Sequence, residues 1–324
     1  MNRRSLMLSL AGTAASALTA RTSVAQQGYP QRPLRVIVPF PPGGATDNNA
    51  RVIARSMSQS LGQSIVIDNR TGANGRVGTE AVALAPADGY TLLVGGIGAL
   101  TIAPHLEKVP YNPLKDFTPV SCLVTFDTVL IVHPSLPVTD VPSLIDYLQR
   151  KGKDTNYASS GPGGPYHMAG ELFKTMANVE MTHVPYKGDG AAIVDLMGGT
   201  VQLMFTSTSA AVPHIRAGKV KLIASGGSQR TRVFPDVRTV SEQGVTGYAL
   251  DSWGGLFGPA GLSPQVVQTL YGAVEKGTQD AALQESISLQ GGTWIASKPV
   301  DFERFLRAEH EKWGKLIRVR DLKI

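Results

Sequence analysis

The chain has 324 residues, of which 42% are hydrophobic and 17% are charged, and its formal net charge is +6 at pH 7. This length predicts two domains or one large one, and a weak positive charge without a run of five Lys or Arg gives no reason to expect a nucleic-acid partner. Cys122 is the only cysteine, so an internal disulfide is excluded and the hydrophobic core must hold the fold. The strand-like context VSCLV indicates that Cys122 is a small buried apolar residue.

Residues 1–25 have the pattern of a secretory signal peptide. Two arginines precede an uncharged, mainly apolar stretch, Ser5–Ala20, and SVA at 23–25 is a small-x-small cleavage pattern. The arginine pair also fits a twin-arginine signal, so the general secretory (Sec) route and the twin-arginine route both stay open. Cleavage after Ala25 would lower the net charge from +6 to +3, because this segment holds three arginines and no acids. We therefore expect a periplasmic mature chain that begins at Gln26.

Alternating strand and helix patterns follow. The first helix is predicted from apolar residues at helical spacing, with Thr46 or Asp47 as its N-cap and Gly62 at its C-terminal end. The predicted elements of this part are a strand at 34–38, that helix, a strand at 64–67, a helix at 79–85 and a strand at 91–95. Such alternation predicts a parallel sheet with helices on both faces.

The rest of the chain continues the pattern. We expect strands at 156–159 and in THVPY, QLMFT, KLIAS and WGGLFG, and helices from about His167, in AAIVDLMGG and SAAVPHIRAG, and at about 264–280 and 300–317. No low-complexity segment or long linker interrupts these elements. Two lobes joined by strands that cross between them are therefore expected.

Two glycine-rich turns, VPFPPGGATD at 38–47 and ASSGPGGPYH at 158–167, occupy equivalent places between a strand and a helix. In open α/β sheets ligands bind at this edge, where the first-turn N–H groups of a helix lack internal partners and carry the positive end of the helix dipole. Glycine lets a ligand approach the backbone, and proline stiffens the turn. The pair of turns therefore predicts an anion site without a cationic side chain, although each turn alone could be purely structural.

Other chemistries find little support. The second turn lacks the third glycine of a dinucleotide fingerprint, because Tyr166 stands in its place, and no G-x-S-x-G or H-E-x-x-H motif occurs. The histidines have no metal-ligand spacing. We expect no cofactor, no metal and no catalytic residue. His167 opens a helix inside the predicted site, and it is either a ligand contact or a first-turn residue bonded to nearby backbone.

The ordered motifs of the chain resemble one family, the periplasmic solute receptors of tripartite tricarboxylate transporters (Bug-type receptors). The resemblance runs from about residue 29 to the C-terminus, and it is carried by RVIVPFPPGGATD, IVIDNRTGANGRVGTEAVALAPADGYTLL, NPLKDFTPVS, YASSGPGG, HMAGELF, HVPYKG, LMGGTVQLMF, PHIRAGKVK and SWGGLFGPAGLS. It implies a two-lobed α/β fold of the periplasmic-binding-protein type (type II) that closes on a carboxylate. The implied lobes are 26–126 with 251–324, and 127–250. The implied partners are a small organic carboxylate and the membrane subunits of a transporter, and the receptor is expected to be a monomer and not an enzyme.

The resemblance also implies the site residues, which grip one carboxylate through backbone amides, hydroxyls and water. In the first turn these are Phe40, Pro41, Pro42, Gly43, Gly44, Ala45, Thr46 and Asp47, and in the second Ser159, Ser160, Gly161, Pro162, Gly163, Gly164, Pro165, Tyr166 and His167; Thr206, Ser207 and Trp253 are expected to face the same cleft.

Some positions depart from the family pattern. Tyr166 stands where relatives carry a small hydroxyl residue, and Thr206 stands where many carry an acid that could pair with a ligand amine. These departures, with Phe40 and Trp253, favour an aromatic mono- or dicarboxylate such as terephthalate over citrate-like or C4 acids, and Thr206 disfavours an amino-acid ligand. Packing in the hinge and core is the other explanation for these rings. Two alternatives stay open. One is a receptor that senses a carboxylate for a signalling partner, and the other is an exported α/β hydrolase.

Overall fold

The computed structural model describes residues 28–289 and 291–323. The predicted signal peptide, residues 1–25, therefore lies outside the described residues. The chain divides into two compact units, residues 1–31 and 32–324. In the first, the Gln31 side chain donates a hydrogen bond to the Gly28 carbonyl.

One mixed sheet of six strands has the order β11-β4-β10-β3-β1-β2. β1 pairs in parallel with β2 and β3, whereas β10 runs antiparallel to β3 and β4, and β11 runs antiparallel to β4. The strands are β1 (Leu34–Val38), β2 (Ile65–Asn69), β3 (Thr91–Gly96), β4 (Phe117–Phe126), β10 (Ser252–Pro259) and β11 (Gly292–Trp294). The expectation of a parallel sheet is thus right for β1 to β3 and wrong for the other half.

A second mixed sheet of five strands has the order β7-β6-β8-β5-β9. β6 is parallel to β7 and β8, and β5 is antiparallel to β8 and β9. Its strands are β5 (Thr128–Val132), β6 (Asn156–Ser159), β7 (Thr182–Pro185), β8 (Leu203–Ser207) and β9 (Lys221–Ser225).

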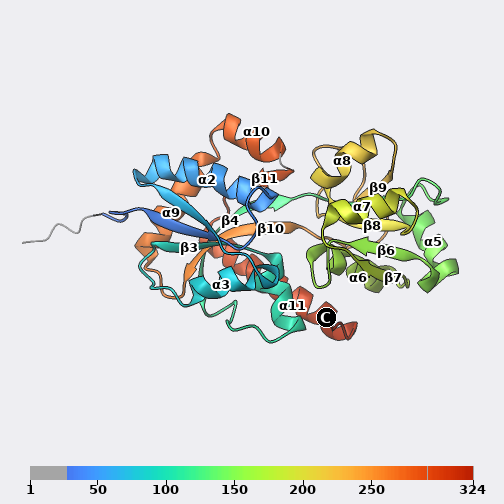
Figure 1. Ribbon diagram of the computed structural model, residues 1–324, viewed down its shortest axis with the longest axis horizontal. Helices are drawn as coiled ribbons and strands as arrows, with labels where there is room; N and C mark the ends of the chain where they lie inside the picture. The colour runs from blue at the N-terminus through green and yellow to red at the C-terminus, as the bar shows by residue number, and fades with distance from the viewer. Residues whose placement is uncertain (1–27, 290, 324) are drawn as a thin grey trace, which may run out of the picture. The chain divides into compact units, whose positions relative to one another are not determined.

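Each sheet has its own helices (Figure 1). Those that contact the first sheet are α2 (Ala45–Leu61), α3 (Arg76–Ala83), α9 (Pro264–Gly277), α10 (Ala281–Leu289) and α11 (Pro299–Val319), and α4 (Ala103–Leu106) lies against α11. Those that contact the second sheet are α6 (Pro165–Ala177), α7 (Asp189–Met197) and α8 (Thr208–Arg216), and α5 (Val141–Lys151) follows β5 in the chain. Gly62 ends α2 in the left-handed conformation, as predicted.

The chain crosses between the sheets twice, and the two crossings lie side by side. β4 passes directly into β5 at Asp127, and the segment after β9 leads back into β10. Gly226 N donates to Thr128 O at 2.7 Å, and Leu250 N donates to Gly226 O at 2.8 Å. Two crossing segments thus join the sheets, although each strand belongs to one sheet only. The lobe boundaries stay a prediction.

Buried apolar side chains pack between each sheet and its helices. Cys122 is a free, buried thiol on β4, as predicted, and burial raises its pKa to about 12. Among the described residues, no helix is both long and apolar enough to cross a bilayer.

Candidate functional site

A cavity of about 340 Å³ lies where the two sheets meet. Loops and helix starts from both sheets line it, because strand ends and the following helices converge there. The lining residues are Phe40, Thr46, Asn74, Gly95, Gly96, Ile97, Gly98, Ala103, Leu106, Glu107, Phe126, Ser160, Gly161, Pro162, Gly163, Gly164, Pro165, Tyr166, Asp189, Ser207, Ser209, Ser252, Trp253 and Gly254. None of these described lining residues is Lys or Arg.

Many predicted site residues gather in this lining. Phe40, Thr46, Ser160, Gly161, Gly163, Gly164, Tyr166, Ser207 and Trp253 lie there, together with Pro162 and Pro165. Pro41, Pro42, Gly43, Gly44, Asp47, Ser159, His167 and Thr206 do not, and Ala45 is placed only as the first residue of α2. Contact of any of them with a ligand stays a prediction.

The first glycine loop, residues 39–44, is held from behind by Asp47. The N-cap of α2 is Gly44, not Thr46 or Asp47 as expected, because Asp47 sits inside the first turn and accepts a hydrogen bond from Gly43 N at 2.9 Å. It also accepts from Arg51 and Asn69, and its side chain is 1% exposed. Burial raises the pKa of Asp47, but these hydrogen bonds outweigh it and leave that pKa below its usual value. Asp47 is therefore placed to shape the loop.

The second glycine loop, residues 160–164, is closed by its own hydrogen bonds. Gly163 has a φ of 67°, and its N–H donates to His167 Nδ1 at 3.0 Å. Gly161 N donates to Ser159 Oγ at 3.2 Å. Helix α6 starts at Pro165, earlier than expected, after a Gly164 N-cap without a side-chain hydrogen bond. The N–H groups of Gly43 and Gly163 thus donate to side chains of the protein itself. An anion would instead be bound by the amides in the first turns of α2 and α6.

His167 bonds to nearby backbone from the first turn of α6, which is one of its two expected roles, and its contact with a ligand stays a prediction. It is 7% exposed and stacks on His183 with ring centroids 3.9 Å apart. Ser159 Oγ lies 2.7 Å from His183 Nε2. Burial lowers the pKa of both histidines, and the neighbouring His167 helps to lower that of His183 to about 3. Both rings are therefore neutral at pH 7, so His167 can accept the Gly163 N–H.

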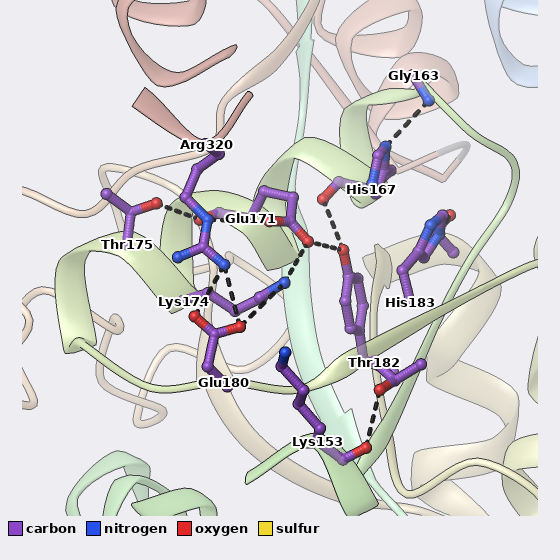
Figure 2. Close-up of polar contacts among 12 residues, drawn as sticks. Lys153, Gly163, His167, Glu171, Lys174, Thr175, Glu180, Thr182, His183 and Arg320 are labelled. Atoms are coloured by element: carbon purple, nitrogen blue, oxygen red, sulfur yellow. Dashed lines mark hydrogen bonds and ion pairs between the residues drawn. The ribbon is translucent and has the colours of Figure 1, made fainter. Parts of the chain in front are cut away.

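Below His167, helix α6 is tied to the C-terminal end of α11 by an ion cluster of Glu171, Lys174, Glu180 and Arg320 (Figure 2). Lys174 Nζ lies 2.8 Å from Glu171 Oε1, and Arg320 reaches Glu180 at 3.1 Å and Glu171 at 3.4 Å. Tyr157 OH donates to the same Glu171 at 2.8 Å. Because α11 packs on the first sheet and α6 on the second, this cluster links the two halves.

Four aromatic residues in the described part of the chain line the cavity: Phe40, Phe126, Tyr166 and Trp253. Trp253 is only 2% exposed, and its indole meets Phe302 and Phe305 edge-on with centroids 5.7 Å away. It therefore serves the core as well as the lining. Phe40 and Tyr166 are partly exposed and come from opposite sheets.

Sequence reasoning missed Asp189, the first residue of α7. It lies in the cavity lining, and its buried Oδ1 has no hydrogen-bond partner in the described part of the chain. Burial raises the pKa of Asp189 to about 6, and the side chains of Ser160 and Thr206 act in the opposite direction. Thr206 stands where relatives carry an acid, but Asp189 brings a carboxylate into the lining beside it. The expectation against a ligand amine did not take this carboxylate into account. The signal was present: HVPYKGDG is a third strand-to-helix glycine turn.

Comparisons with known proteins point in one direction. The model of the tripartite tricarboxylate transporter family receptor matches residues 49–322. Protein BugT of Bordetella pertussis is 35% identical over 297 residues, which are 91% of this chain and 91% of that protein. Two solved structures are similar to this chain. One is R. palustris Rpa4515 with adipate, with a TM-score of 0.77, 35% identity and coverage of 90% of this chain and 97% of that one. The other is MatC from Rhodopseudomonas palustris with bound malate, with a TM-score of 0.75, 33% identity and coverage of 89% of this chain and 100% of that one. These likenesses confirm the predicted two-lobed α/β fold.

Proposed function

Because the chain belongs to the receptor family of tripartite tricarboxylate transporters, we propose that it captures an organic carboxylate in the periplasm and delivers it to the membrane subunits of such a transporter. Family members and solved relatives of this kind are solute-binding receptors, so we assign the cavity no catalytic step. The proposal includes export through the signal peptide at 1–25 and a monomeric receptor.

One observation carries the proposal: two helix N-termini from different sheets open at the same cavity. Helices α2 and α6 both follow glycine N-caps without a side-chain hydrogen bond, and Thr46 and Tyr166 of their first turns lie in the lining. An anion at a helix N-terminus gains about 0.3–1 kcal/mol from each dipole, and more in a partly buried site. Two converging helix starts can therefore bind a carboxylate in a lining that has no lysine or arginine among its described residues.

We propose that the two halves act as lobes, 26–126 with 251–324 and 127–250, and that they close around the carboxylate. The position of the cavity between the sheets supports this division. Relatives solved with adipate and with malate support a small carboxylate as the ligand class.

We propose further that the ligand body is aromatic, as in benzoate or terephthalate. Phe40 and Tyr166 come from opposite sheets and Trp253 from β10, and all three line the cavity, so a flat ring bound there would have aromatic side chains to pack against. Ring–ring contacts contribute about 0.5–1.5 kcal/mol beyond burial when the geometry is offset or edge-on.

Competitive calorimetry with terephthalate, benzoate, succinate and citrate tests this function. We expect an aromatic acid to bind most tightly to the wild type, and Tyr166→Ser to weaken that acid about three- to tenfold, while aliphatic acids change little. Tighter binding of succinate or citrate than of either aromatic acid would overturn the aromatic ligand but keep the carboxylate receptor. A folded wild type that binds no carboxylate would overturn both.

A further inference from the structure

The acids of the cavity lining differ in how their charge is balanced. Glu107 forms an ion pair with Arg76 at 2.5 Å, so its negative charge is neutralised within the protein. Asp189 has no ion pair in the described part of the chain, and its buried Oδ1 has no hydrogen-bond partner there. Buried carboxylates are normally paired with a cation and hydrogen-bonded at both oxygens, and a buried oxygen without a donor destabilises the charged form.

The surroundings of Asp189 offer hydroxyl groups but no cation. The Ser160 and Thr206 side chains lie close enough to favour its charged form, and Thr206 is fully buried. Burial and the Asp189 carboxylate both raise the pKa of the Tyr166 phenol. Tyr166, at the start of α6, therefore lies close enough to Asp189 to interact with its charge. The position of Asp189 in the first turn of α7 also favours a negative charge. The carboxylate is thus held at the cavity wall without a positive partner.

The arrangement constrains the ligand. A dicarboxylate would bring a second negative charge towards Asp189 in a lining without lysine or arginine among its described members, and like charges at short range repel strongly outside bulk water. An ammonium group would instead supply the missing counter-charge and hydrogen-bond donors to the buried oxygen. On the basis of the proposed carboxylate function, we propose that Asp189 selects a carboxylate that also carries an ammonium group. This narrows the aromatic ligands proposed above, because it disfavours a dicarboxylate such as terephthalate.

Matched ligand pairs test this proposal by calorimetry at pH 7.5. The pairs are glutarate and glutamate, adipate and 6-aminohexanoate, and terephthalate and 4-(aminomethyl)benzoate. In each pair an ammonium group is added or replaces the second carboxylate, at different distances from the first. We expect the wild type to bind at least one ammonium-bearing ligand at least tenfold more tightly than its partner.

The variant Asp189→Asn keeps the shape of the side chain and removes its charge. We expect it to lose at least tenfold in affinity for the preferred ammonium ligand and to bind the matched dicarboxylate no more weakly than the wild type does. Asp195→Asn is the control, because Asp195 lies on the same helix, bonds to Tyr186 OH at 2.8 Å and is outside the cavity lining. It should leave the preference unchanged, and thermal unfolding of each variant checks that it is folded.

The outcomes separate the two proposals. If the wild type binds a dicarboxylate but no ammonium ligand more tightly, or if Asp189→Asn keeps the ammonium preference, the role of Asp189 is overturned and the carboxylate receptor stands. If no member of the panel binds to folded wild type, both proposals fail.

Discussion

At the scale of single residues, the two glycine loops show that a loop N–H group can donate its hydrogen bond to a side chain of the same protein even when the loop lies beside a cavity. Gly163 needs its left-handed φ of 67° to direct its N–H to His167, and Gly43, with a φ of 81°, directs its own N–H to Asp47. These bonds set the loop shape, and the first-turn amides of the helices become the groups that meet an anion.

We expect Gly163→Val to weaken carboxylate binding at least tenfold, because a β-branched residue cannot adopt this φ without strain and the loop at the cavity must shift. Gly218→Val is the matched control, since Gly218 has a φ of 65° in a turn away from the cavity lining. Both variants should lose about 1–2 kcal/mol of stability from backbone strain. Calorimetry and urea unfolding measure the two effects, and normal binding by folded Gly163→Val would remove this loop from the site.

Sequence patterns predicted local features well at this scale and tertiary ones poorly. Gly62 as a C-terminal residue of α2 and Cys122 as a buried strand residue depend only on near neighbours, and both are confirmed. The N-cap of α2 was mispredicted because Asp47 reaches back to Gly43 from within the helix. Asp189 was overlooked because an acid at a helix start is common, and only the fold brings it beside Thr206 and into the cavity.

At the scale of elements, strand positions followed from β-branched runs, but strand directions did not. β10 pairs with β3 and β4, which are more than 100 residues away, and it is antiparallel to both. Local alternation of strands and helices carries no information on such distant pairings. Helix α10 was not predicted as a separate element, because we extended the preceding helix to Asp280 and its nine residues have no cap signal that we recognised.

Helix α6 and its paired histidines predict a pH dependence of stability. His167 and His183 have pKa values below the ordinary value of 6.5 in the folded state, with Glu171 and Lys174 as the charged groups that face them. The unfolded chain therefore binds more protons, so stability is fully present above pH 6.5 and falls as the pH drops towards 3. The slope is at most about 1.4 kcal/mol per pH unit for each histidine.

Urea unfolding between pH 7.5 and 4 tests this dependence. His183→Gln should flatten the loss between pH 6.5 and 4.5 relative to the wild type. His214→Gln, on helix α8 and outside the stacked pair, should keep the wild-type slope. Equal slopes for wild type and His183→Gln would show that the stacked pair does not titrate as the buried geometry indicates.

At the scale of the whole second unit, the ion cluster of Glu171, Lys174, Glu180 and Arg320 is a non-covalent link between the sheets. We expect Arg320→Ala to weaken ligand binding by up to about fivefold, because a partly exposed ion pair contributes roughly 0–1 kcal/mol. Its buried partner Glu171 keeps Lys174, so the variant should fold. Arg307→Ala is the control, since Arg307 pairs with Glu303 within the same helix at 2.8 Å. Calorimetry on the wild type and both variants measures the ligand affinity. If Arg320→Ala binds the ligand as tightly as the wild type does, the ion cluster has no role in binding.

The side-by-side crossings between the sheets have a mechanical consequence. Two short, hydrogen-bonded segments at Asp127 and Leu250 leave one easy rotation about the line through them, while sliding or twisting of the sheets would stretch both at once. If the halves move as proposed, we expect a motion that is mainly a rotation about this line, with the ion cluster of Glu171, Lys174, Glu180 and Arg320 opening or closing along with it. One distance across the cavity, followed with a pair of probes on the two sheets, would be enough to report the whole movement.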